Sequence, residues 1–137
     1  MIIPFYEDLA VIFLSELALL DKSRTLSISE ISKKHSLSPL FLKKIARMLI
    51  HSGFIKSKEG VHGGYNLSID PTRVTLWDIY SAIDQSKNKQ ELNAPLNYSV
   101  CPVNNTCLPQ IIRKETRSAI QKSLQTVSLA SLIKKVV

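Results

Sequence analysis

The chain has 137 residues, 45% of them hydrophobic, and carries a formal net charge of +7 at pH 7. This length and composition exclude an intrinsically disordered chain and fit one domain with a core of its own. The positive charge is concentrated, because residues 27–65 and 108–137 each sum to +5 while residues 1–26 sum to −2. Such cationic blocks are typical of proteins that bind nucleic acid or an acidic membrane surface, although they also fit a solvated lysine-rich face.

The first twenty residues are strongly apolar and predict a helix over residues 7–20, because their apolar side chains recur at helical spacing. They do not resemble an export signal, since Glu7, Asp8 and Glu16 interrupt the apolar run and no basic head precedes it. No uncharged apolar stretch reaches the roughly 18 residues that span a bilayer. The sequence therefore predicts a soluble, cytoplasmic protein without a membrane partner.

Two short helices with clear boundaries are predicted next. Ser27 and Glu30 have the spacing of a capping box, which predicts a helix that starts at residue 27 and runs to about residue 35. A second helix is predicted over residues 38–51, with Ser38 as N-cap and Pro39 at the first helical position, where its missing N–H costs nothing.

The second of these helices has one apolar and one basic side. The side expected to be buried comprises Leu42, Ile45 and Leu49, with Phe41 and Met48 on its flank. Lys43, Lys44 and Arg47 lie on the other side. A short helix, a tight turn and a longer basic helix form a helix-turn-helix, whose second helix enters a DNA major groove. The same pattern also fits a helical hairpin with its lysines in water.

A glycine-rich segment separates two predicted strands, "GFIKS" and "GYNLS". The "KEGVHGG" between them predicts a hairpin loop, because Gly60, Gly63 and Gly64 permit positive φ or close backbone approach. A hairpin directly after a helix-turn-helix is the wing of a winged helix, and its Lys56, Lys58 and His62 suit phosphates or a minor groove. A nucleotide-binding loop is a weaker interpretation, because "GVHGG" precedes a strand and no "GK[ST]" follows.

The rest of the chain divides into three predicted parts. A helix starts near residue 75 and closes a DNA-binding domain of residues 1–83. Residues 84–107 are polar and predict a flexible loop that holds both cysteines. Residues 108–137 predict a long helix over 108–125 followed by a short terminal helix. The apolar stripe of the long helix needs a docking surface, for which a partner chain is the best candidate.

These segments together resemble the Rrf family of bacterial winged-helix regulators, which includes IscR, NsrR and CymR. The resemblance rests on "FYEDLAVIFLSELA", on "SISEISKKHSLSPLFLKKIARMLIHSGFIKS", on "EGVHGGYNLSIDPTRVTLWDIYSAID", and on "CPVNNTC" with the terminal "VSLASLI". It implies a mainly α fold with a small β-hairpin, made of a winged helix-turn-helix domain and a long C-terminal dimerisation helix. It also implies a homodimer that binds a pseudo-palindromic operator and regulates transcription.

Three positions depart from the pattern of the family. Glu59 stands where relatives usually have arginine, His62 stands where many have another arginine, and Lys43 replaces an acidic residue that relatives often carry. Glu59 is expected to weaken phosphate binding locally, and Lys43 and Lys58 are expected to offset that loss. DNA binding is therefore predicted to persist with an altered operator preference and a steep dependence on salt.

The expected partners are double-stranded DNA and a second copy of the chain, with a regulatory protein or small molecule as the signal. The chain shows no nucleophile–base pair, metal-ligand set or cofactor fingerprint, so it is not expected to be an enzyme. The alternative is an interaction module that has lost DNA binding or cluster sensing. The residues expected to contact DNA are Ser38, Leu40, Phe41, Lys43, Lys44, Arg47, Lys58, His62, Gly63 and Gly64.

Cys101 and Cys107 are the only cysteines. The resemblance to the Rrf family implies that they correspond to the first two of the three cysteines that hold an iron–sulfur cluster in some members, and that Asp8 corresponds to a further cluster ligand. The third cysteine is missing, because Arg113 stands near its expected place. Three hypotheses stay open: a thiol pair that oxidises to a disulfide, a [2Fe–2S] cluster with unusual ligands, and two cysteines without chemistry.

Overall fold

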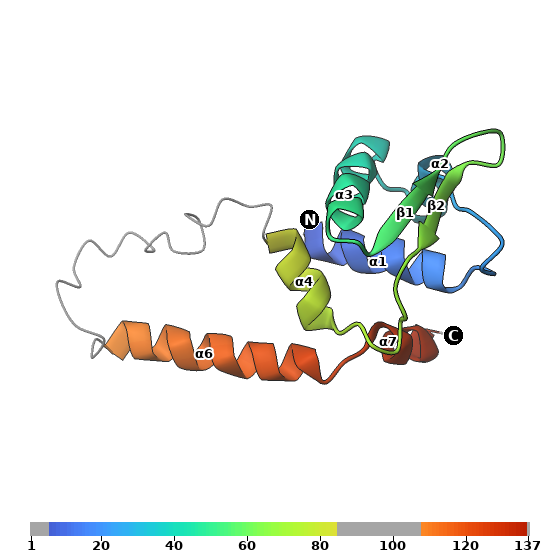
Figure 1. The fold of residues 1–137 in the computed structure, drawn as a ribbon. Coiled ribbons are helices and arrows are strands. Elements are labelled where there is room, and N and C mark those ends of the chain that lie inside the picture. The colour runs from blue at the N-terminus through green and yellow to red at the C-terminus, as the bar shows by residue number, and fades with distance from the viewer. Residues whose placement is uncertain (1–5, 85–107, 137) are drawn as a thin grey trace.

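The computed structural model describes residues 6–84 and 108–136. In chain order the elements are α1 (Tyr6–Ala18), α2 (Ile28–His35), α3 (Pro39–His51), β1 (Ile55–Lys58), β2 (Gly64–Leu67), α4 (Leu76–Asp84), α6 (Leu108–Gln125) and α7 (Leu129–Val136). In Figure 1, α3 and the hairpin lie over α1, while α6 projects away from this body. The described residues are thus mainly helical with one small hairpin, which confirms the predicted fold class.

The core lies where α1, α3, α4 and the hairpin meet. Its completely buried large side chains are Phe13, Leu14, Ile31, Leu42, Ile45, Leu49, Ile79, Ile83 and Leu129. The ring of Phe13 meets the ring of Tyr65 edge to face, with 5.5 Å between the centroids, so α1 is joined to strand β2. The apolar sides predicted for the first helix and for α3 are therefore both used in one core. None of the helices that the structure describes is long and apolar enough to cross a membrane.

α2 is fixed at both ends by polar contacts. The hydroxyl of Ser27 accepts a hydrogen bond from the N–H of Glu30, whose carboxylate accepts one from the N–H of Ser27, so the predicted capping box is present. Near the other end of α2, Lys34 and His35 contact the two carboxylate oxygens of Glu16 on α1, at 2.8 Å and 2.7 Å. Burial raises the pKa of Glu16, but the hydrogen bonds and positive charge of these partners lower it to below its ordinary value.

The hairpin pairs β1 and β2 antiparallel, with Ile55 opposite Leu67 and Lys58 opposite Gly64. The backbone of Leu26, in the segment before α2, extends this sheet through two hydrogen bonds to Tyr65, of 3.1 Å and 2.9 Å. The β2 edge of the hairpin is thus anchored to the segment that enters α2.

α7 returns to the body. The N–H of Leu76 donates to the carbonyl of Val127 and the N–H of Leu129 donates to the carbonyl of Val74, at 2.9 Å and 2.8 Å. Leu129 is completely buried in the common core. α6 and α7 therefore have different surroundings, although they are consecutive in the chain. Of the predicted loop over residues 84–107, only Asp84, at the end of α4, belongs to the described residues.

Candidate nucleic-acid interface

The outer face of α3 carries most of the predicted DNA contacts. Leu42, Ile45 and Leu49 are completely buried, so the residues that alternate with them on the helix point to solvent. Leu40 and Phe41 are 73% and 49% exposed, and Lys43, Lys44 and Arg47 are exposed as well. α3 contains no carboxylate. Its outer face is therefore both apolar and cationic at its N-terminal half.

Ser38 is at the N-cap of α3, as predicted, and Pro39 is at the first helical position. The Ser38 hydroxyl makes no capping hydrogen bond, in contrast to that of Ser27. Ser38 is exposed. Its hydroxyl can therefore bond a ligand that approaches the start of α3.

Lys44 differs from the other cations of α3 because an internal partner holds it. Its ammonium donates a hydrogen bond of 3.1 Å to the Tyr6 hydroxyl and lies 4.6 Å from the centroid of the Tyr6 ring. The same ring meets Phe41 edge to face at 6.2 Å. Tyr6 thus connects the start of α1 to the outer face of α3. No sequence motif indicated this contact, because Tyr6 belongs to the apolar start of the chain.

Gly63 and Gly64 are positions where the wing admits no side chain. A Cβ on Gly63 would lie 2.6 Å from the carbonyl oxygen of Lys58, across the turn. A Cβ on Gly64 would lie 2.8 Å from the carbonyl oxygen of Leu26, and Gly64 has φ of +151°. The two glycines therefore let the turn close and the hairpin approach the segment before α2.

The wing tip is held from outside the hairpin by Thr25. Its hydroxyl donates to the carbonyl of His62 at 2.7 Å and lies 3.2 Å from that of Gly63. The sequence did not indicate this role, because Thr25 is distant in the chain and belongs to no motif. Lys58, Glu59 and His62 are exposed at the tip, so one carboxylate lies among the expected phosphate contacts.

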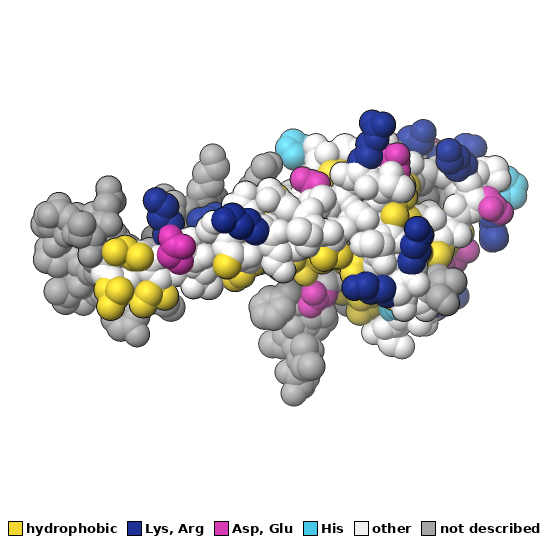
Figure 2. Space-filling view, turned by 90° about the horizontal axis from the view of Figure 1, so that it is seen from below, with side chains coloured by type: hydrophobic (Ala, Val, Ile, Leu, Met, Phe, Trp, Pro, Cys, Tyr) yellow, Lys and Arg dark blue, Asp and Glu magenta, His cyan; other side chains and the backbone are white. Residues whose placement is uncertain are grey.

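The basic side chains of the body gather at the winged-helix end. Figure 2, seen from below, shows Lys and Arg side chains around the end of the molecule that carries the hairpin, and others along α6. Apolar side chains gather instead at the far end of α6. There Leu108, Ile111 and Ile112 are 67%, 42% and 54% exposed. The described residues leave this face of α6 exposed.

The candidate metal ligands are not brought together in the residues described. Asp8 is exposed on the first turn of α1, near Tyr80, whose pKa is raised by burial and by the charges of Asp8 and Glu7. The described residues hold no group of three or more His, Cys, Asp and Glu side chains that could bind a metal ion. Cys101 and Cys107 lie outside the described residues.

The arrangement of α2, α3 and the hairpin defines a winged helix-turn-helix, a class of DNA-binding protein. The family model for Rrf2, described as an iron-dependent transcriptional regulator, matches residues 6–135. The chain therefore belongs to the Rrf2 family of DNA-binding transcriptional regulators, which confirms the resemblance seen in the sequence.

Individual relatives agree with this assignment. The chain is 29% identical over 125 residues to the protein rrf2 of Nitratidesulfovibrio vulgaris, with 88% of this chain and 79% of that protein covered. The structure of IscR from T. potens superposes with a TM-score of 0.76 at 20% identity, over 100% of this chain and 89% of that one. The structure of CymR, the global cysteine regulator of B. subtilis, gives a TM-score of 0.72 at 23% identity over 98% of both chains.

Proposed function

We propose that this protein binds operator DNA as a homodimer, with α3 in the major groove and the wing on the neighbouring backbone or minor groove. The observation that carries the proposal is the outer face of α3, where exposed Leu40, Lys43 and Arg47 stand on a helix without a carboxylate. A helix of this kind, placed second in a helix-turn-helix, is the element that reads base edges.

The residues of α3 suit different parts of the duplex. Lys43 and Arg47 can donate to guanine edges or to phosphates, and Leu40 and Phe41 can pack on thymine methyl groups. The Ser38 hydroxyl, which makes no capping hydrogen bond, can donate to a phosphate. At the wing, Lys58 and His62 suit the phosphates that flank the groove, with Glu59 opposing them.

The dimer is proposed from α6. Pairing of two α6 helices would cover the exposed Leu108, Ile112 and Ile120 of both chains. The two copies of α3 would then meet successive major grooves, about 34–36 Å apart, which makes the operator a pseudo-palindrome. Binding is expected to weaken steeply with salt, by nearly one unit of the log–log slope for each phosphate neutralised.

The sensing chemistry is a separate question. An iron–sulfur cluster takes four ligands, mostly thiolate, and Cys101, Cys107 and Asp8 supply three, of which only Asp8 is described in the structure. The donor set is one short, so our proposal includes no cluster. Anaerobic purification with iron, sulfide and free-thiol counts tests this: stoichiometric iron would contradict it, and two titratable thiols would direct attention to a Cys101–Cys107 disulfide.

The decisive test of DNA binding replaces Lys43 and Arg47 together by alanine. We expect the variant to fold normally and to lose its preference for an operator selected by the wild-type protein from a pool of random duplexes. The matched control replaces the exposed Lys134 and Lys135 of α7, which removes the same charge from a helix outside the helix-turn-helix. If the wild type selects no sequence, or if both variants lose affinity equally, the chain is an interaction module and not an operator-binding regulator.

A further inference from the structure

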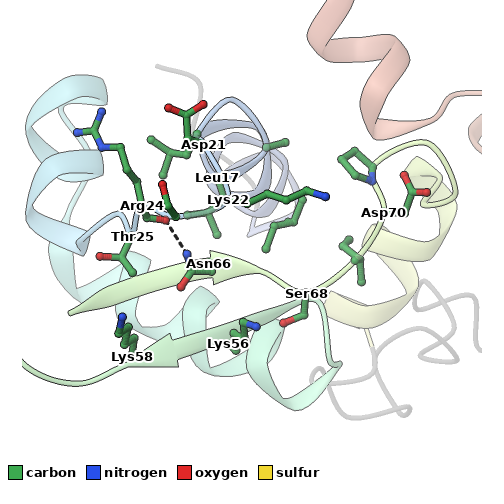
Figure 3. Close-up of a pocket in the computed structure, with 16 residues that line it drawn as sticks. Leu17, Asp21, Lys22, Arg24, Thr25, Lys56, Lys58, Asn66, Ser68 and Asp70 are labelled. Carbon is green, nitrogen blue, oxygen red and sulfur yellow. Dashed lines mark hydrogen bonds between the residues drawn. The ribbon is translucent and has the colours of Figure 1, made fainter. Parts of the chain in front are cut away.

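A groove with both charged and apolar lining lies along the outer side of the hairpin. Figure 3 shows it between the segment that follows α1, which carries Asp21, Lys22 and Arg24, and the hairpin strands with Lys56 and Lys58. The volume of this wing groove is about 890 Å³, and residues 68–71 close one end of it. Lys56 is one of the wing lysines expected to suit phosphates, whereas Lys22 and Arg24 belong to none of the DNA contacts described above.

The strand pattern explains why two of the groove's lysines face outward. Ile55 is buried in the core. Because side chains alternate along a strand, Lys56 lies on the opposite face of β1 from Ile55, and Lys58, two residues further on, lies on the same face as Lys56. Both are exposed, as are Lys22 and Arg24. Four cationic side chains from two distant parts of the chain therefore line one groove.

The positive charge of the groove is only partly offset by its own carboxylates. In the part of the chain that the structure describes, no ion pair joins these four cations to a carboxylate. The groove contains two carboxylates, Asp21 and Asp70. One oxygen of Asp70 accepts hydrogen bonds from the N–H and the hydroxyl of Thr72, at 2.9 Å and 2.6 Å, and the other lies 3.8 Å from Arg73. The net charge of the groove is thus positive, and its partner must be anionic.

The groove is rigidly joined to the wing tip. The side-chain amide of Asn66 on β2 donates to the backbone carbonyl of Arg24 at 2.6 Å, as the dashed line in Figure 3 shows. The neighbouring Thr25 holds the carbonyls of His62 and Gly63. The backbone segment that carries Arg24 is therefore held beside the hairpin and its tip.

We propose that the wing groove binds the sugar–phosphate backbone of DNA beyond the half-site read by α3, with Lys22, Arg24 and Lys56 as phosphate ligands. The proposal rests on the proposed function and extends it to DNA that carries no sequence signal. Because the groove faces away from the core side of the hairpin, the flanking duplex reaches it by curving round the wing. The phosphate contacts offset the cost of that bend, which depends on the flexibility of the flanking sequence.

The test compares two duplexes in a binding titration by fluorescence anisotropy. One contains only the selected operator, and the other carries about ten further base pairs at each end, one helical turn. We expect wild-type protein to bind the longer duplex more tightly. A variant with Lys22 and Arg24 replaced by alanine is expected to lose this advantage, keep its affinity for the short duplex, and show a log–log salt slope on the long duplex lower by about two units for each protomer.

The outcomes separate this proposal from the function on which it rests. The Lys134→Ala, Lys135→Ala control is expected to keep both the length advantage and the slope. If the groove variant weakens binding to both duplexes equally, or to neither, the groove does not bind flanking DNA, while operator recognition by α3 stands. If wild-type protein shows no preference for the operator over an unrelated duplex, the proposed function fails. In that case, if the groove still binds DNA, the variant with Lys22 and Arg24 replaced by alanine would show a lower log–log salt slope than the wild type on the unrelated duplex.

Discussion

Helices α2 and α3 are consecutive and pack on each other, but they use their polar side chains differently. In α2, Ser27 and Glu30 cap the first turn, and Lys34 and His35 contact Glu16 on α1. In α3, Ser38 makes no capping bond, and Lys43 and Arg47 are exposed, with no ion pair among the described residues.

The difference suggests that the polar side chains of α2 hold the fold together, whereas those of α3 are available to bind DNA. The polar groups of α2 stabilise its place in the fold, so substitutions there are expected to change the free energy of unfolding. The polar groups of α3 make few internal contacts, so substitutions on its outer face are expected to change DNA affinity and leave folding intact. The inner face of α3 belongs to the core and must behave as α2 does.

The largest expected effect tests the two faces of α3 with one residue type. Leu42→Ala removes a completely buried side chain and is expected to lower the free energy of unfolding by about 2–5 kcal/mol. Leu40→Ala, at a position that is 73% exposed, is expected to change it by less than about 0.5 kcal/mol and to weaken operator binding. Urea denaturation and a binding titration measure the two quantities. Equal destabilisation by both variants would contradict the assignment of the faces.

The next effect compares the two N-cap serines. Ser27→Ala removes a hydroxyl that caps α2 and is expected to lower the free energy of unfolding by about 1 kcal/mol. Ser38→Ala removes a hydroxyl that caps nothing, so the stability is expected to stay unchanged while operator affinity falls. Thermal unfolding of both variants, with a binding titration of each, checks this. A stability loss in Ser38→Ala as large as that in Ser27→Ala would show that α3 is capped after all.

A smaller effect is expected from the contact between α1 and α2, and it depends on pH. Because the folded-state pKa of Glu16 is below its ordinary value of 4.5, the carboxylate stabilises the fold above that pH, and this stabilisation is lost as the pH falls through the folded-state pKa. Solvent screens the pair, since Lys34 is 62% exposed. We expect Glu16→Gln to cost less than about 1 kcal/mol at pH 7.

The check is the free energy of unfolding of wild type and Glu16→Gln from pH 7 down to pH 3. The difference between them is expected to shrink as the pH falls below 4.5. Glu59→Gln serves as the control, because it removes the same charge from an exposed wing residue and is expected to leave stability unchanged. A difference that grows toward acid pH would reverse the assigned role of Glu16.

Local sequence patterns predicted the elements of the fold well. The Ser27–Glu30 spacing, Pro39 after Ser38 and the glycines of the hairpin each act within a few residues, so the sequence alone exposes them. The long-range contacts were not predictable in this way. Glu16 meets α2, Thr25 holds the wing tip and Leu129 enters the core from the end of the chain. None of these pairings has a periodic or local signal.

The candidate site shows the same limit. The cations of α3 could be assigned to an exposed face from helical spacing, and the structure places them there. Their different partners could not be assigned, because the contact of Lys44 with Tyr6 depends on how α1 crosses α3. In the wing groove, Lys56 and Lys58 were predicted as wing residues, but Lys22 and Arg24 were not assigned to any site, since their approach to the hairpin depends on the docking of residues 22–25.

A comparably small effect is expected for Lys44, which differs from the other cations of α3. Its contacts with the Tyr6 hydroxyl and ring are expected to contribute about 0.5–1 kcal/mol to stability. A double-mutant cycle of Tyr6→Leu with Lys44→Ala measures this coupling, and the cycle of Tyr6→Leu with Lys43→Ala is the control, expected to show none. Because the ammonium of Lys44 is already bound by the hydroxyl and ring of Tyr6, we also expect Lys44→Ala to weaken operator binding less than Lys43→Ala does. The reverse order would mean that Lys44 leaves Tyr6 to bind a phosphate when DNA binds. The contact with Tyr6 would then compete with DNA binding.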